Sequence, residues 1–140
     1  MCIQNLTEKG VIHYQLIKDG AKSENFHKFL TEIKLPTDKQ HYLLLDNARI
    51  HHANQACRKL GLSAIKELLF QKNIQPKYLP AYTPELNPVE LCFNFIRQYV
   101  EKCQPRTFKE LENSIDRAMN TLNKKDLTEF FWHCFNFTFC

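Results

Sequence analysis

A short apolar run, Tyr42-Leu43-Leu44-Leu45, constrains the fold of this chain more than any other segment. A continuous apolar run of this length is typical of a strand that is buried on both faces in a parallel sheet. It ends at Asp46 and Asn47, so polar side chains are expected at the carboxyl end of the strand. Ligands of open α/β sheets bind at that edge. The run therefore predicts an α/β fold with its chemistry at the strand ends.

The residues before this run predict a β-hairpin and one helix. Strand-like patterns over 2–6 and 11–17 flank a turn at 7–10. Ser23 is a suitable N-cap for a helix whose apolar side chains recur every three to four residues, and Pro36 would stop it.

The residues after the run predict more helices and one further strand. A helical pattern over 53–73 is interrupted near Gly61, and a strand over 74–79 contains Pro76, which favours an edge position. A proline-rich connector leads into a helix from Pro88 to about Cys103. Thr107 and Asp126, each with Glu three residues later, predict two more capped helices. This order favours a mixed sheet, antiparallel at one side and parallel at the other.

Composition limits the function classes without selecting one. The 140 residues suffice for one domain, and a net charge of +4 permits a polyanionic partner without requiring one. The sequence has no apolar stretch long enough to span a membrane and no leader pattern, so we expect an intracellular protein. The six cysteines form no C-x-x-C pair, which favours unpaired structural thiols.

Two carboxylates stand at positions suited to chemistry, and each has a plainer interpretation. Asp46 alone is typical of a strand-ending turn. Glu90 can complete a capping box with Asn87, because Pro88 fits the first helical position. The helix places a polar row on one face and an apolar row on another. The polar row is Glu90, Asn94, Arg97 and Glu101, and the apolar row is Val89, Phe93, Ile96, Val100 and Cys103.

Two segments taken together resemble a known family. The first is Leu44-Leu45-Asp46-Asn47-Ala48 with His51-His52, and the second is Leu79-Pro80-Ala81-Tyr82-Thr83-Pro84-Glu85-Leu86-Asn87-Pro88-Val89-Glu90. They resemble the C-terminal half of the catalytic domain of DDE transposases of the Tc1/mariner and IS630 superfamily. Members typically read Asp-Asn-Ala after a leucine-rich strand, then His, then Leu-Pro-x-Tyr-Ser/Thr-Pro-Asp/Glu-Leu-Asn-Pro-x-Glu. The similarity weakens beyond about Pro105.

The resemblance implies an RNase H-like fold and phosphoryl transfer on DNA assisted by two divalent ions, Mg²⁺ or Mn²⁺. Asp46 and Glu90 are the expected catalytic and metal-binding residues, since carboxylate oxygens suit these hard cations. Asn47, His51 and Arg97 are expected to support nucleic-acid binding.

The sequence departs from the family pattern at its start. The family's first catalytic acid lies on a central first strand that has no counterpart here, and Asp19 stands in the wrong place to replace it. No helix-turn-helix region is recognisable. We therefore expect a partial DDE endonuclease domain over 1–140, with a helical extension over 105–140, that is a truncated copy and inactive alone.

Several partners and alternatives follow from this reading. DNA is the expected partner, together with a full-length transposase or a second copy, in the nucleus if the host is eukaryotic. The main alternative is a catalytically inactive module for DNA binding or protein interaction. Zinc ligation remains a minor alternative with either of two residue sets: His51, His52 and Cys57, or His133, Cys134 and Cys140.

Overall fold

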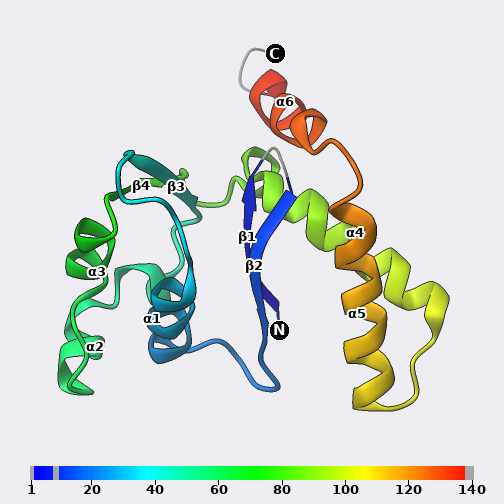
Figure 1. Ribbon diagram of the computed structural model, residues 1–140, viewed down its shortest axis with the longest axis horizontal. Coiled ribbons are helices and arrows are strands. Elements are labelled where there is room, and N and C mark those ends of the chain that lie inside the picture. The colour runs from blue at the N-terminus through cyan, green and yellow to red at the C-terminus, as the bar shows by residue number, and fades with distance from the viewer. Residues whose placement is uncertain (1, 8–9, 138–140) are drawn as a thin grey trace. The chain divides into compact units, whose positions relative to one another are not determined.

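The computed structural model describes residues 2–7 and 10–137, and these divide into two compact units (Figure 1). The first unit comprises residues 1–3 and 17–83, and the second comprises 4–16 and 84–140. Each is described by itself.

The first unit holds helices α1 (Ser23–Glu32), α2 (Asn54–Lys59) and α3 (Ile65–Gln71) and strands β3 (His41–Leu45) and β4 (Ile74–Tyr78). A 3₁₀ turn, η1 (Arg49–His52), follows β3. The two strands are parallel, with His41 opposite Ile74 and Leu45 opposite Tyr78. The predicted helical pattern over 53–73 is confirmed, and its interruption falls at Gly61, whose φ of 74° suits a residue without a Cβ.

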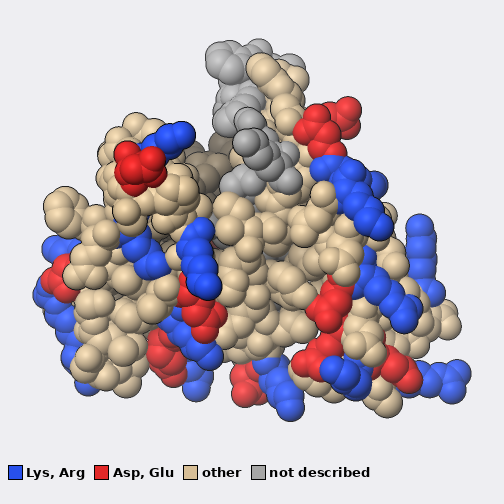
Figure 2. All heavy atoms as spheres, viewed as in Figure 1, with Lys and Arg blue, Asp and Glu red and all other residues tan. Residues whose placement is uncertain are grey.

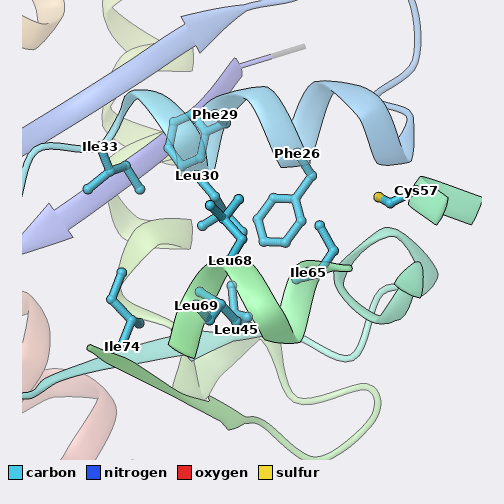
Figure 3. Packing of buried hydrophobic residues seen from close by; sticks show 10 residues of the cluster. All are labelled: Phe26, Phe29, Leu30, Ile33, Leu45, Cys57, Ile65, Leu68, Leu69 and Ile74. Atoms are coloured by element: carbon cyan, nitrogen blue, oxygen red, sulfur yellow. The ribbon is translucent and has the colours of Figure 1, made fainter. Parts of the chain in front are cut away.

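The core of this unit lies between its helices and one face of β3 and β4 (Figure 3). Helix α1 contributes Phe26, Phe29 and Leu30, and α3 contributes Leu68 and Leu69. The spacing of these residues along each helix places them on one side, which faces the strands. The sheet contributes Leu45 and Ile74, and the cluster also includes Ile33, Cys57 and Ile65.

The second unit contains strand β2 (Gly10–Leu16), the 3₁₀ turn η2 (Pro84–Leu86) and helices α4 (Pro88–Cys103), α5 (Phe108–Leu122) and α6 (Thr128–Phe137). Strand β1 (Cys2–Thr7) pairs with β2. Only two residues separate these strands, so their pairing is antiparallel. The predicted hairpin is thus confirmed, although residues 8 and 9 of its turn lie outside the described residues.

Helix α5 fixes β2 within the second unit. The Asn123 side chain at the end of α5 accepts a hydrogen bond from the Val11 amide at 2.8 Å. The Tyr14 hydroxyl donates to the Asp116 carboxylate on the same helix. Buried side chains of α4, α5 and α6 form the apolar interior: Cys92, Ile96, Ile115, Ala118, Met119, Leu122 and Cys134.

The prediction of one mixed sheet is wrong for the described residues. The structure has two separate two-stranded sheets, β1–β2 and β3–β4. No described strand joins the second edge of β3, so nothing continues the hydrogen-bond ladder from the parallel pair to the hairpin. The chain is nevertheless a mixture of helices, a small parallel sheet and a hairpin, which is consistent with the α/β, RNase H-like class.

Two local predictions are also corrected. Strand β3 is not buried on both faces, because Tyr42 is 65% exposed and Leu44 37% exposed while the helices cover the opposite face. Helix α1 is capped by Lys22 and not by Ser23, since the Asn25 side chain accepts a hydrogen bond from the Lys22 amide at 2.8 Å. No helix among residues 2–7 and 10–137 is long and apolar enough to cross a membrane.

Replacing Leu30 by Ala should destabilise the first unit by about 2–5 kcal/mol, because the fully buried side chain leaves a cavity between α1 and α3. Phe70→Ala is the control, since Phe70 is 86% exposed and its loss should change stability by less than about 0.5 kcal/mol. Urea unfolding followed by circular dichroism measures both. Equal effects of the two changes would contradict the described packing.

Candidate functional site

The carboxyl ends of β3 and β4 lie side by side and bring two sequence segments together. After the last strand pair, Leu45 with Tyr78, the Leu79 amide donates a hydrogen bond to the Leu45 carbonyl at 2.8 Å. Asp46 therefore leaves the sheet next to the start of the proline-rich segment. This edge is where parallel sheets of α/β proteins place their ligand sites.

Asp46 stands at this edge with its side chain about half exposed, at 54%. Its Oδ1 accepts a hydrogen bond from the Ala48 amide at 3.1 Å and lies 2.9 Å from Nδ1 of His51. The strand-ending turn expected as the plainer interpretation is thus present. Among the described residues, nothing bonds the second oxygen, Oδ2. The turn therefore uses one carboxylate oxygen and leaves the other for a ligand.

His51 is held against Asp46 and is largely buried, with 14% of its side chain exposed. Its Nδ1 also lies 3.0 Å from the Asp46 carbonyl oxygen, and its ring contacts Phe26 with centroids 4.5 Å apart. Because both Asp46 acceptors surround Nδ1, the proton of a neutral ring is best placed on that nitrogen. His51 therefore fixes the orientation of the carboxylate.

A second pair of side chains lines the same edge. His52 Nε2 lies 2.6 Å from the amide oxygen of Asn47, and its ring stacks on Tyr78 with centroids 4.3 Å apart. Burial raises the pKa of the Tyr78 phenol. The structure thus places Asp46, Asn47 and His51 close together. Tyr78 lies at the same edge, and nothing in the sequence indicated this because Tyr78 has the pattern of an ordinary strand residue.

Glu90 lies on the first turn of α4, which begins as predicted. Asn87 is the N-cap, and its side chain accepts a hydrogen bond from the Val89 amide at 3.3 Å. The Asn87 amide donates to the Pro84 carbonyl at 3.0 Å, so it is not bonded by Glu90 in a capping box. Within the part of the chain that the structure describes, the Glu90 carboxylate makes no hydrogen bond or ion pair. The capping interpretation of Glu90 is therefore wrong.

The exposed face of α4 carries the polar residues that the sequence placed there. Asn94, Arg97 and Glu101 are exposed, and Glu90 on the same face is partly buried. The Arg97 guanidinium lies 3.5 Å from the Asn94 amide oxygen, a weak contact that leaves most of its donors available.

The apolar row of α4 is shifted from its predicted position. Cys103 is exposed, whereas Cys92 and Ile96 are the buried pair, one turn apart. Burial raises the pKa of the Cys92 thiol to about 12. Packing against α5 and α6 decides which side of α4 is buried. The sequence of α4 alone does not indicate this packing.

Neither zinc alternative gains support. Within residues 2–7 and 10–137, no three His, Cys, Asp or Glu side chains gather closely enough to hold a metal ion by themselves. Cys57 is fully buried, while the side chain of His52 is engaged by Asn47. Cys140, the last residue of the second zinc set, lies outside the described residues. The unpaired cysteines include Cys57, Cys92, Cys103 and Cys134, as the composition predicted.

The candidate residues fall into two groups, one in each unit. Asp46, Asn47 and His51 belong to the first unit, and Glu90 and Arg97 belong to the second. Basic and acidic side chains are interspersed on the face that is visible in Figure 2.

A comparison with protein families finds a match that covers most of the chain. The model of the DDE superfamily endonuclease family matches residues 2–113, which include every candidate residue described above. No curated protein and no solved structure gives a significant match.

The orientation of α4 can be tested through its two cysteines. At pH 8, iodoacetamide should modify Cys103 and leave Cys92 unmodified, because burial both blocks Cys92 and raises its pKa so that it stays a thiol. Peptide mass spectrometry measures the two sites, and both should react once the protein is unfolded in guanidinium. Equal reaction in the native protein would contradict the described burial.

Proposed function

Because the chain belongs to the DDE superfamily of endonucleases, we propose that it derives from a transposase of the Tc1/mariner or IS630 type. The parent chemistry is metal-dependent DNA cleavage and strand transfer. The observation that carries this proposal is the availability of both motif carboxylates. Asp46 keeps one oxygen unbonded at a strand end, and Glu90 is not used in capping its helix.

The proposed cofactor is Mg²⁺ or Mn²⁺, with two ions in a complete site. Mg²⁺ is commonly bound by one or two carboxylates, several waters and substrate phosphates. Asp46 and Glu90 suit this mode, because each carboxylate keeps an oxygen that no described residue bonds. Such ions activate the attacking oxygen and stabilise the leaving one when bound.

The remaining candidate residues have proposed supporting roles. The exposed guanidinium of Arg97 shares a helix face with Glu90 and is suited to contact a DNA phosphate. We propose that Asn47 and His51 support DNA binding next to Asp46. The contacts of His51 with Asp46 support a role in holding the carboxylate in position.

The extent of the domain and its partners are also proposals. Residues 1–140 form part of a DDE endonuclease domain, and 105–140 form its helical extension. The proposed macromolecular partner is DNA, with a full-length transposase or a second copy of this chain as a protein partner. The family resemblance also implies a first catalytic acid on a central first strand, and this stays a prediction.

A second candidate function is a catalytically inactive module that binds DNA or a transposase. It is favoured by the sequence, in which two of the three acids that the family resemblance implies are matched, Asp46 and Glu90. The two functions differ in whether divalent ions at Asp46 and Glu90 support cleavage.

Where the chain cleaves supercoiled plasmid in Mg²⁺, alone or with a full-length transposase, Asp46→Asn and Glu90→Gln should each lower that cleavage by at least about 100-fold, because metal assistance is worth several kcal/mol. Asn at position 46 still offers an acceptor to the Ala48 amide, so the turn is kept. Glu101→Gln is the matched control, as Glu101 lies exposed on the same face of α4 and should be dispensable.

A direct measurement of metal binding complements the cleavage assay. Mn²⁺ should broaden the amide resonances of residues 46–52 and 88–94, and each of the two acid variants should reduce this effect. Cleavage that persists unchanged in both variants would contradict the site. Mn²⁺ binding without cleavage would favour the inactive module instead.

A further inference from the structure

Tyr82 has a strained backbone and a side chain that contributes nothing to the packing. Its φ is 60°, in the left-handed region, which is unusual for a bulky residue. Among the described residues other than glycine, Asn73 and Gln104 also have a positive φ, and both stand at the ends of helices, where this conformation is common. Tyr82 follows no helix. Its side chain is 99% exposed and makes no hydrogen bond with any described residue.

The backbone of the turn that contains Tyr82 is restrained by its neighbours. Pro80 and Pro84 restrict the backbone on either side, and the Thr83 hydroxyl donates a hydrogen bond to the Pro80 carbonyl at 2.7 Å. Tyr82 occupies the third position of the turn 80–83, where Gly or Asn normally accommodates a positive φ. Backbone strain of this kind lowers the folding equilibrium constant by roughly one to two factors of ten, and it concentrates at functional sites. The turn therefore directs an exposed aromatic side chain into solvent.

The turn 80–83 starts from the same sheet edge as Asp46. Leu79 is hydrogen-bonded to Leu45, the residue before Asp46, and Tyr82 is three residues beyond Leu79. Three residues span at most about 10 Å. A DNA strand that runs along this edge would therefore pass bases within reach of Tyr82.

We propose that Tyr82 stacks on an unpaired base of a DNA strand that runs past Asp46 and so positions that strand in the site. This inference rests on the proposed function for its choice of DNA as the ligand. An aromatic side chain on a rigid turn is the usual means of holding an unpaired base, and this stacking tolerates any base sequence. The neighbouring residues at the strand ends, Asn47, His52 and Thr83, are polar, which suits a nucleotide better than an apolar protein surface.

The test measures binding of a single-stranded oligodeoxynucleotide that contains 2-aminopurine, with the full chain in EDTA. Tyr82→Ala should weaken binding by about 5- to 150-fold, the loss of one base stack, and should abolish quenching of the 2-aminopurine fluorescence. Tyr82→Phe should retain both, because stacking needs the ring and not the hydroxyl. Phe70→Ala is the matched control, since Phe70 is 86% exposed on α3 and lies outside this edge.

A second variant separates binding from folding. Tyr82→Gly should bind as poorly as Tyr82→Ala but show an unchanged or higher Tm, because Gly adopts a positive φ without strain. A lower Tm for Tyr82→Gly would show that the side chain is structural and would overturn the proposal. Three other results would overturn it. They are unchanged binding by Tyr82→Ala, no binding by the unsubstituted chain, and a Tyr82→Ala variant that changes its oligomeric state but not its affinity for DNA.

Failure of this inference differs from failure of the proposed function. The binding assay contains no divalent ion, so its outcome does not depend on metal at Asp46 or Glu90. Cleavage that requires both acids, together with unchanged binding by Tyr82→Ala, overturns the stacking alone. If Tyr82→Ala weakens binding while cleavage is unchanged in both acid variants, the metal site alone is overturned.

Discussion

The parallel pairing of β3 with β4 is the interaction on which the candidate site depends. It sets Leu45 opposite Tyr78, and the hydrogen bond from Leu79 to Leu45 then extends the contact past the strands. The Asp46 loop and the proline-rich segment are far apart in the sequence. Because of this register, both begin at the same edge of the sheet. A slip by one residue would turn every β3 side chain to the opposite face and remove Leu45 from the core.

Much of the fold follows from local patterns. The positions of Pro88 and Thr107 located the starts of α4 and α5, because capping depends on residues adjacent in the sequence. Strand β4 tolerates Pro76 since it is paired on one side only in the described sheet. The extent of the sheet could not be predicted in this way. The exposure of Tyr42 and Leu44 depends on which elements cover a strand and not on the strand itself.

The sequence motifs proposed the acids of the candidate site but could not predict their contacts. The motifs singled out Asp46 and Glu90. Whether Asp46 only closes a turn and whether Glu90 caps its helix depend on neighbouring residues that sequence spacing does not identify. His51 takes only one oxygen of Asp46, and Pro84 takes the Asn87 amide that a capping box would have used. The stack of His52 on Tyr78 joins residues from different elements, so no local pattern indicates it.

These contacts support an account in which the carboxylates of Asp46 and Glu90 are each available to a divalent metal ion. A crystal of the chain soaked in Mn²⁺ tests this most directly through the anomalous scattering of the metal. The account predicts metal about 2 Å from a carboxylate oxygen of Asp46 and about 2 Å from one of Glu90. Metal at only one of the two acids, or at neither, would contradict it.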